Sequence, residues 1–408
     1  MRGQWANRLR LGGAIRALWS RVGGLLRGPA APEPDAAPPA RPVRGAQDHV
    51  ILLDGTRGSL RAGEETSIGI LYHYLRATNP RASVYYGKGL QWREWRDLSD
   101  VMLGWGVNRQ ILRAYGWLAS RYRPGDRIFL IGYSRGAFAA RSLAGIIDRV
   151  GLLRHQDATE RNIRLAWRYY EAEEPPPVAG IFRRRFCHDG TRIEMVGAFD
   201  TVMAIGNRLP FLWVLHEPRY RFHDHRLGPS VNHGYQALAL DESRSVLEPL
   251  IWDSGATGAA RIEQVWFKGC HGDIGGQLPG FEMARPLANI PLVWMLERAE
   301  ALGLALPTDW RADFPCDPAA PAAGSWRGWG KFYLLRAPRV VGRDQSERIH
   351  ESAIGGRRDW RMILRPWIAR QDRRAELLRL AREQAVEGPD PGGSSDLRVS
   401  ALPAQDIA

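Results

Sequence analysis

The stretch Ile128-Phe129-Leu130-Ile131-Gly132-Tyr133-Ser134-Arg135-Gly136 decides the fold of this chain. Four apolar residues lead directly into Gly-x-Ser-x-Gly, and residues 137–147 continue with small and apolar side chains at helical spacing. A buried strand, a sharp turn and a helix are the setting that a nucleophile elbow requires. The two motif glycines lack Cβ atoms, so strand and helix can approach closely around a strained serine. The motif predicts Ser134 as a nucleophile and the Arg135 amide, at the helix N-terminus, as an oxyanion donor.

Short apolar runs alternate with helical patterns on both sides of this motif. The expected strands are 49–53, 84–86, 128–131, 193–199 and 263–269, and the expected helices are 65–78, 106–122, 137–147 and 286–302. The alternation predicts an α/β fold of the α/β-hydrolase type, with a mainly parallel sheet and helices on both faces. The helical stretch 157–173 and the basic run 183–185 are expected to form a cap or insertion over the sheet. Residues 201–231 are expected to form a second, loop-rich insertion.

Composition divides the chain into four parts. Residues 1–28 carry six arginines, no acidic residue and apolar residues at helical spacing, which predicts a basic amphipathic leader. Residues 29–47 are rich in Pro and Ala and are expected to form a linker. The α/β-hydrolase domain is expected over 48–370, and a short helix with a disordered tail over 371–408. The leader is expected to contact a membrane at its periphery, with docking on a protein partner or disorder as the alternatives.

The bulk composition excludes several classes of protein. The formal charge is +13, and it comes from arginine, since the chain has only three lysines. Arginine-rich composition without zinc-finger or RNP-like motifs is not a sign of nucleic-acid binding, so no nucleic-acid partner is expected. Three widely spaced cysteines favour a reducing, cytoplasmic compartment. The arginines of the leader interrupt any secretory signal, and no apolar run approaches the ~20 residues that span a bilayer.

A nucleophilic serine needs a base within hydrogen-bond reach and a carboxylate that orients the base. Asp200 follows the expected strand 193–199, and His271 follows the expected strand 263–269. The order Ser, Asp, His and the position at strand ends are those of α/β hydrolases, so Ser134, Asp200 and His271 are the expected triad. The competing acids are Asp241 and Asp273. The competing histidines are His188, His216, His223, His225, His233 and His350.

A second oxyanion amide should come from the loop after the first strand, where Gly55 and Thr56 are the candidates. His223 and His225 have no third metal ligand at a recognisable spacing, so no metal and no cofactor are expected. Cys270 is adjacent to His271, but neighbouring residues on a strand point apart, so we expect a small buried side chain there.

The chain resembles the α/β-hydrolase domain of phospholipase effectors of type VI secretion and of related bacterial and fungal proteins. The segments that carry the resemblance are Asp54-Gly55-Thr56, Tyr85-Tyr86-Gly87-Lys88-Gly89, Gly132 to Arg141, Phe199-Asp200-Thr201-Val202, Ala237 to Arg244 and Trp266 to Gly276. Together they are far more specific than Gly-x-Ser-x-Gly alone. The resemblance implies the same triad of Ser134, Asp200 and His271. Effector members of this family cleave acyl esters of glycerophospholipids.

The sequence departs from the family pattern at two positions. Arg57-Gly58 follow Asp-Gly-Thr where the family often has an asparagine, and His271-Gly272-Asp273 replaces the usual His-Ser-Asp. We expect a serine hydrolase that cleaves acyl esters, with lipids or phospholipids as the substrate class and an unknown protein partner. The alternatives are a soluble esterase or thioesterase acting on a small acyl substrate, and a non-catalytic α/β-hydrolase fold that serves as a binding module.

Overall fold

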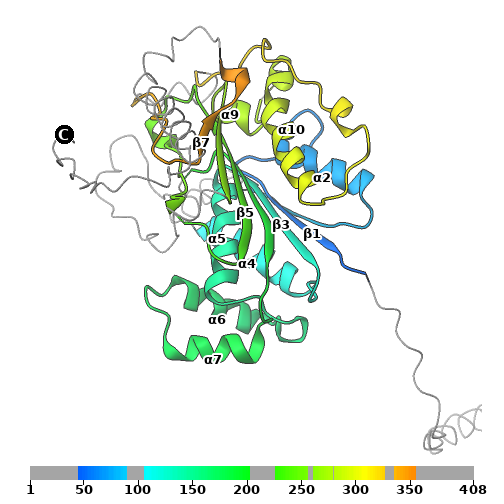
Figure 1. Cartoon of the computed structure of the whole chain (residues 1–408), viewed down its shortest axis with the longest axis vertical. Helices are drawn as coiled ribbons and strands as arrows, with labels where there is room; N and C mark the ends of the chain where they lie inside the picture. The colour runs from blue at the N-terminus through cyan, green and yellow to red at the C-terminus, as the bar shows by residue number, and fades with distance from the viewer. Residues whose placement is uncertain are drawn as a thin grey trace, which may run out of the picture. The chain divides into compact units, whose positions relative to one another are not determined.

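The computed structural model describes residues 45–89, 105–202, 226–255, 261–278, 280–326 and 335–354. Within these ranges seven strands form one sheet in the order β2-β1-β3-β4-β5-β6-β7, and every neighbouring pair is parallel (Figure 1). The strands are β1 (Asp48–Leu53), β2 (Ser83–Gly87), β3 (Arg127–Tyr133), β4 (Ile193–Phe199), β5 (Val231–Ala239), β6 (Ile262–Phe267) and β7 (Glu347–Ile349). The predicted α/β class and parallel sheet are confirmed.

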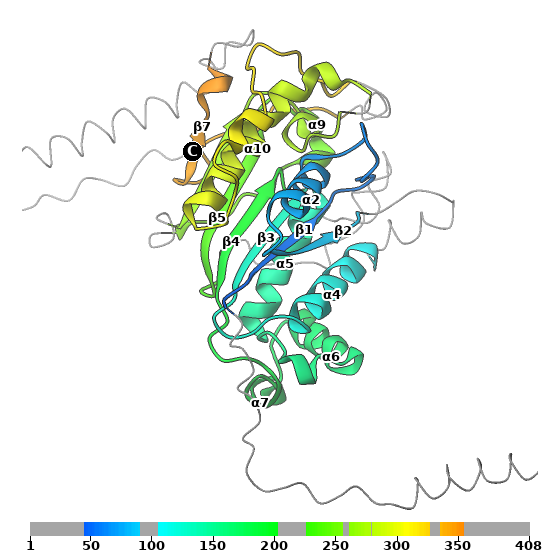
Figure 2. The same cartoon turned by 90° about the vertical axis from the view of Figure 1, so that its right-hand side faces the viewer.

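Helices cover both faces of this sheet (Figure 2). On one face lie α2 (Ser67–Thr78) and α10 (Arg285–Ala301), and on the other lie α4 (Trp105–Ala119) and α5 (Arg135–Arg149). The remaining α-helices are α6 (Glu160–Glu171), α7 (Pro177–Phe186) and α9 (His271–Ile274). Short 3-10 turns lie at η1 (His155–Asp157), η3 (Ser245–Leu247), η4 (Glu282–Ala284), η5 (Trp310–Asp313) and η7 (Glu351–Ala353).

Helices cover both faces of the sheet because apolar side chains along the strands alternate between the two faces. In β1, Val50 and Leu52 pack with α2 and α10, whereas Ile51 and Leu53 pack with α4 and α5. Residues 128–131 of β3 divide between the same two clusters in alternation. Successive side chains on a strand point to opposite faces, so an unbroken apolar run requires a hydrophobic layer on each side.

The strand register brings the candidate site residues to one edge of the sheet. Tyr133 pairs with Phe199, and Phe199 pairs with Ala237 on the next strand. Ser134 and Asp200, each the residue after its strand, therefore leave the sheet at the same level. The chain beyond β6 begins α9 at His271 on this edge.

Two features differ from the sequence prediction. Strand β5 begins at Val231, although residues 231–235 include polar positions that favour a loop in the sequence. The insertion after α5 is present as α6 and α7, but it packs at the far end of α5 from Ser134. There Arg149 donates to the carbonyl oxygens of Tyr170 and Glu173. Figure 1 shows α6 and α7 at the amino ends of the strands, so this insertion does not lie over the site.

Several predictions concern residues outside the described ranges. They include the leader 1–28, nearly all of the linker 29–47, the tail 371–408, and His216, His223 and His225 within the insertion. Among the described helices, none combines the length and the apolar character needed to cross a membrane.

The close contact between α5 and the sheet can be tested by a substitution that adds one methyl group. A Cβ on Gly136 would lie 2.1 Å from the Leu53 carbonyl oxygen, which is backbone and cannot move aside cheaply. Gly136→Ala should therefore lower the free energy of unfolding by on the order of 3 kcal/mol, measured by urea denaturation. Gly180→Ala in α7 is the control, because its Cβ would meet only Arg184 Nη1 at 3.7 Å. Equal stabilities of the two variants would contradict the close approach.

Candidate active site

Ser134 occupies a strained turn between β3 and α5. Its φ of 57° and ψ of −122° lie in a region that residues with a side chain rarely adopt. The turn is possible because Gly132 and Gly136 face each other, and a Cβ on Gly132 would lie 2.3 Å from the Gly136 carbonyl oxygen. The Ser134 amide donates to the Phe199 carbonyl oxygen at 2.9 Å, which ties the turn to the end of β4. This geometry is that of a nucleophile elbow.

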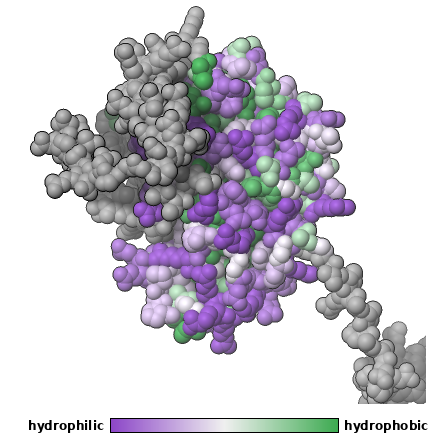
Figure 3. Space-filling view, viewed as in Figure 1, coloured by the Kyte–Doolittle hydropathy of each residue, from purple (hydrophilic) through white to green (hydrophobic). Residues whose placement is uncertain are grey.

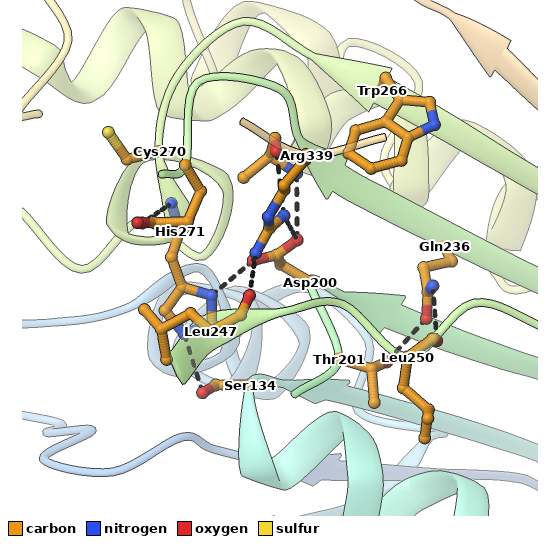
Figure 4. A network of polar contacts seen from close by, with 12 residues as sticks. Ser134, Asp200, Thr201, Gln236, Leu247, Leu250, Trp266, Cys270, His271 and Arg339 are labelled. Atoms are coloured by element: carbon orange, nitrogen blue, oxygen red, sulfur yellow. Dashed lines mark hydrogen bonds and ion pairs between the residues drawn. The ribbon is translucent and has the colours of Figure 1, made fainter. Parts of the chain in front are cut away.

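The three predicted triad residues lie together in one hydrogen-bonded chain (Figure 4). Ser134 Oγ lies 2.8 Å from His271 Nε2, and His271 Nδ1 lies 2.6 Å from Asp200 Oδ2. A carboxylate accepts only, so His271 carries its proton on Nδ1 and leaves Nε2 free to accept from the serine hydroxyl. Asp200 is fully buried, and the other two side chains are nearly so. The three side chains thus form a continuous hydrogen-bonded series from the serine hydroxyl to the carboxylate.

Asp200 is held by a residue that the sequence analysis did not identify. Arg339 Nη1 and Nη2 donate to Asp200 Oδ1 at 2.5 Å and Oδ2 at 2.9 Å, a bidentate ion pair between two buried side chains. The same guanidinium donates to the Ala239 and Leu247 carbonyl oxygens. The Ala239 amide donates to Asp200 Oδ1 at 3.0 Å. Each of the two carboxylate oxygens of Asp200 thus accepts two hydrogen bonds, which fixes the orientation of the side chain.

The charge state of Asp200 follows from these contacts. Burial alone would raise its pKa, but the Arg339 charge and the hydrogen bond from His271 bring the pKa well below the ordinary value of 3.8. Asp200 is also one of the described non-glycine residues with positive φ, at 46°. Asn and Asp tolerate this conformation better than bulkier residues do.

Glu242 and Asp273 hold the loop that carries His271. Glu242 Oε2 accepts from the His271 amide at 3.2 Å, and Arg244 pairs with the same carboxylate at 2.6 Å. Asp273 accepts from the Cys270 and Ala323 amides. The competing acid Asp241 likewise accepts from a backbone amide, that of Gly269 at 2.7 Å. Of the three candidate carboxylates, only Asp200 contacts the imidazole among the described interactions.

The first loop lies against the nucleophile and is anchored by Asp54. A Cβ on Gly55 would lie 3.1 Å from Ser134 Cβ, so the loop backbone touches the elbow. The Gly55 amide, a predicted oxyanion donor, donates instead to Asp54 Oδ1 at 2.7 Å. Asp54 also accepts from Thr66 and Tyr86. Burial raises the pKa of Asp54 to about 6, although the hydrogen bonds from Tyr86, Thr66 and Gly55 act in the opposite direction.

Thr56 and Arg135 complete the set of predicted oxyanion donors. The Thr56 carbonyl oxygen accepts from Gln277 Nε2, and its hydroxyl is buried without a partner among the described residues. Arg135 is the first residue of α5, directly after Ser134. Arg135 therefore adjoins Ser134 in the chain, and Thr56 follows Gly55, which lies against Ser134.

Arg57-Gly58, where the family often has asparagine, forms a tight turn. Arg57 adopts a left-handed φ of 63°, and the Gly58 amide donates to the Gly55 carbonyl oxygen. A Cβ on Gly58 would fall 2.2 Å from Asp54 Cγ. The glycine thus lets the chain pass directly over the Asp54 carboxylate.

The competing histidines that lie within the described ranges have separate contacts. His188 lies edge-on to Tyr122, His233 stacks on Tyr235, and His350 stacks on Phe267. Cys270 is buried, as expected, and burial raises the pKa of its thiol well above the ordinary value. No cluster of metal-ligating side chains occurs within the described ranges.

One curated protein is similar in sequence to part of this chain. An uncharacterized protein of Saccharomyces cerevisiae is 32% identical over 184 residues, which are 38% of this chain and 27% of that protein. The chain thus matches about a quarter of the length of this curated relative.

Two solved structures are similar to parts of the chain. A Tle1 effector bound to the VgrG spike of the type 6 secretion system is 18% identical with a TM-score of 0.36, covering 58% of this chain and 52% of that one. An uncharacterized protein from Pseudomonas aeruginosa is 16% identical with a TM-score of 0.39, covering 67% of this chain and 49% of that one. The model of the type VI secretion Tle1-like phospholipase effector catalytic domain matches residues 47–298, and the chain belongs to this family.

Proposed function

We propose that the protein is a serine hydrolase that cleaves acyl esters of lipids or phospholipids. The observation that carries the proposal is the unbroken chain from Ser134 Oγ through His271 to Asp200, with contacts of 2.8 and 2.6 Å. Such a chain supplies a nucleophile, a base and an orienting carboxylate in hydrogen-bond reach.

The reaction would proceed in two steps at Ser134. His271 Nε2 takes the hydroxyl proton as Oγ attacks the ester carbonyl carbon, and it then gives the proton to the leaving alkoxide. Water, activated by the same nitrogen, releases the acid from the acyl-enzyme. Asp200 fixes the imidazole tautomer and stabilises the imidazolium that forms in each step.

The developing oxyanion would be bound by backbone amides beside the elbow. The Arg135 amide, at the N-terminus of the 15-residue helix α5, is one proposed donor. On the first loop, Asp54 already accepts from the Gly55 amide, so we assign the second contact to Thr56. Its amide or its buried hydroxyl would make this contact.

Membership of a family described by phospholipase effectors supports a lipid ester over a small acyl substrate. The surface in Figure 3 is mainly hydrophilic on the face shown, with hydrophobic residues in small groups. Val178 and Ile181 are exposed on α7, at the opposite end of α5 from Ser134. Contact through α7 would therefore turn Ser134 away from a bilayer, and we propose that the leader 1–28 makes the membrane contact. As an extended chain, the 19 residues of 29–47 would reach about 60 Å.

A kinetic series on the triad tests the proposed chemistry. Ser134→Ala should lower kcat for a p-nitrophenyl ester by at least about a thousandfold, because the nucleophile is lost. Asp200→Asn should lower kcat by about 10⁴, because the base remains but in the wrong tautomer, and His271→Ala should cost more. Asp241→Asn is the matched control, because it makes the same change at the competing acid, which accepts from the Gly269 amide at 2.7 Å.

Near wild-type turnover by Ser134→Ala would refute the serine mechanism. A larger loss in Asp241→Asn than in Asp200→Asn would refute the choice of acid. Hydrolysis of p-nitrophenyl esters without hydrolysis of phospholipid vesicles would favour the small-substrate esterase.

Arg339 should stabilise the fold through the charge of Asp200. Arg339→Met leaves a buried carboxylate without its cation and should lower the free energy of unfolding by about 3 kcal/mol at pH 7. The pKa of Asp200 is lower in the folded state than in the unfolded state, so its ionisation stabilises the fold at pH values above the unfolded-state pKa. This stabilisation is lost as the pH falls from the unfolded-state pKa towards the folded-state pKa. The difference in the free energy of unfolding between the wild type and Arg339→Met should persist from pH 7 to about pH 4 and shrink at lower pH.

Urea denaturation across this pH range measures the effect. Arg343→Met is the control, because Arg343 pairs with Glu248 at 2.9 Å with both side chains well exposed and should contribute less than about 1 kcal/mol. Equal losses for the two arginines would contradict a buried, functional ion pair at Asp200.

Deletion of residues 1–28 tests the proposed membrane contact. The truncated protein should sediment less with anionic vesicles at low salt, because each arginine near such a surface contributes about 1 kcal/mol. Hydrolysis of a p-nitrophenyl ester should not change. A full-length variant with the six leader arginines replaced by glutamine separates the charge from the apolar residues. Equal sedimentation of full-length and truncated protein would favour a leader that binds a protein partner.

A further inference from the structure

A buried arginine, Arg339, and a half-buried one, Arg141, donate to the segment Leu247–Leu250. Among the described residues, only Arg339 has a carboxylate partner. Arg339 bonds the Leu247 carbonyl oxygen and pairs with Asp200. Arg141 bonds the Leu250 carbonyl oxygen at 2.6 Å and makes a longer contact of 3.4 Å with Gln236 Oε1, both through Nη1. Among the described residues no carboxylate pairs with Arg141, and its buried Nη2 has no hydrogen-bond partner. A buried cation with an unused donor group is costly unless an anion completes it.

The guanidinium of Arg141 is held in a fixed orientation. It lies over the Trp252 ring at 4.5 Å, and Trp252 is itself fully buried. Gln236 also accepts from Oγ1 of Thr201, which is the residue after Asp200 (Figure 4). Through Gln236, the contacts of Arg141 continue to the end of β4. Burial lowers the pKa of Arg141 to about 9, although the nearby Tyr170 acts in the opposite direction.

Arg141 lines a cavity of about 220 Å³ that follows one side of α5. The cavity extends from Phe138, whose amide donates to the Ser134 carbonyl oxygen, to Arg149 in the last turn. Arg226 lines it as well, with Asp148 as the acidic lining residue. Arg149 donates to backbone carbonyl oxygens, and Asp148 accepts from the Ser230 amide. Arg226 also pairs with Asp253 at 3.2 Å, so the three guanidinium groups are set against two carboxylates, which leaves an excess of one positive charge.

We propose that this cavity is a phosphate-binding subsite, in which Arg141 donates to the anion and Arg149 and Arg226 add positive charge at its walls. A guanidinium fork matches the paired oxygens of phosphate, and the excess of positive charge favours an anion. The phosphate could belong to a lipid headgroup or be free in solution. Binding itself does not depend on hydrolysis at Ser134, and only assignment to a headgroup rests on the proposed function.

Titration of the full-length protein with inorganic phosphate tests the subsite. Calorimetry at constant ionic strength should show saturable binding that acetate and chloride do not match. Arg141→Lys should weaken this binding by at least about tenfold, because lysine keeps the charge but loses the second pair of donors. Arg226→Gln, at a side chain that is 74% exposed and can be replaced without unfolding, should weaken it by about threefold. Arg161→Gln on the exposed side of α6 is the control and should bind like the wild type.

The outcomes distinguish a phosphate-binding role of Arg141 from a purely structural role. Absence of saturable phosphate binding, or equal binding by acetate, would overturn it. If Arg141→Lys does not fold, unchanged binding in Arg226→Gln would overturn it instead. The source of the phosphate follows from competition in the wild-type enzyme. Phosphate that raises the KM for phospholipid vesicles, but not for a p-nitrophenyl ester, assigns the subsite to the headgroup, and no competition assigns it to free phosphate.

Discussion

The closeness of α5 to the sheet is the constraint on which the rest of the structure depends. Two glycines allow it, because a Cβ at Gly132 or Gly136 would lie 2.3 or 2.1 Å from a backbone oxygen. With that approach, Ser134 takes a conformation with positive φ and its hydroxyl reaches His271. The apolar helix behind it and the two-sided burial of β1 and β3 supply the packing energy that offsets such local strain. The elbow is thus a consequence of the layered fold, and the site lies where that fold stores strain.

A buried carboxylate shared between a cation and an imidazole is the second organising feature. Arg339 neutralises Asp200 and fixes its orientation, so the carboxylate is ionised without needing solvent. The arginine lies beyond the matched family segment 47–298, in residues 335–354 beside β7. A protein truncated at the end of the matched segment would therefore leave Asp200 buried without its cation. The final part of the described chain belongs to the site as much as the elbow does.

Much of this could be predicted because the signals are local. Strand β3, the elbow and α5 follow from one continuous stretch, and strand ends placed Asp200 and His271 at the edge where they meet. Arg339 could not be found in this way, since it lies 139 residues from Asp200 and follows no periodic pattern. The helical stretch 157–173 and the basic run 183–185 predicted an insertion, which is present as α6 and α7, but did not indicate which end of the sheet it covers. The first half of β5 contains polar residues, so the sequence analysis did not predict this interior strand from Val231 onward.

The first loop shows a different kind of limit. Asp-Gly-Thr at a strand end offered Gly55 and Thr56 as candidates for one oxyanion amide, yet the Asp54 side chain accepts from the Gly55 amide. Aspartate in turns often makes this contact, so local chemistry competed with the expected role of Gly55. The anchored loop then leaves Thr56 and the helix terminus at Arg135 as the groups beside the nucleophile.

The central claim is that the elbow and its base make one serine, Ser134, an activated nucleophile. Labelling of the folded protein with a fluorophosphonate, followed by peptide mapping with mass spectrometry, tests this claim most directly. The account predicts a single adduct on Ser134, formed by the wild type and abolished in His271→Ala, because the base must take the hydroxyl proton. An adduct on another residue, or equal labelling of Ser134 after acid unfolding of the protein, would contradict it.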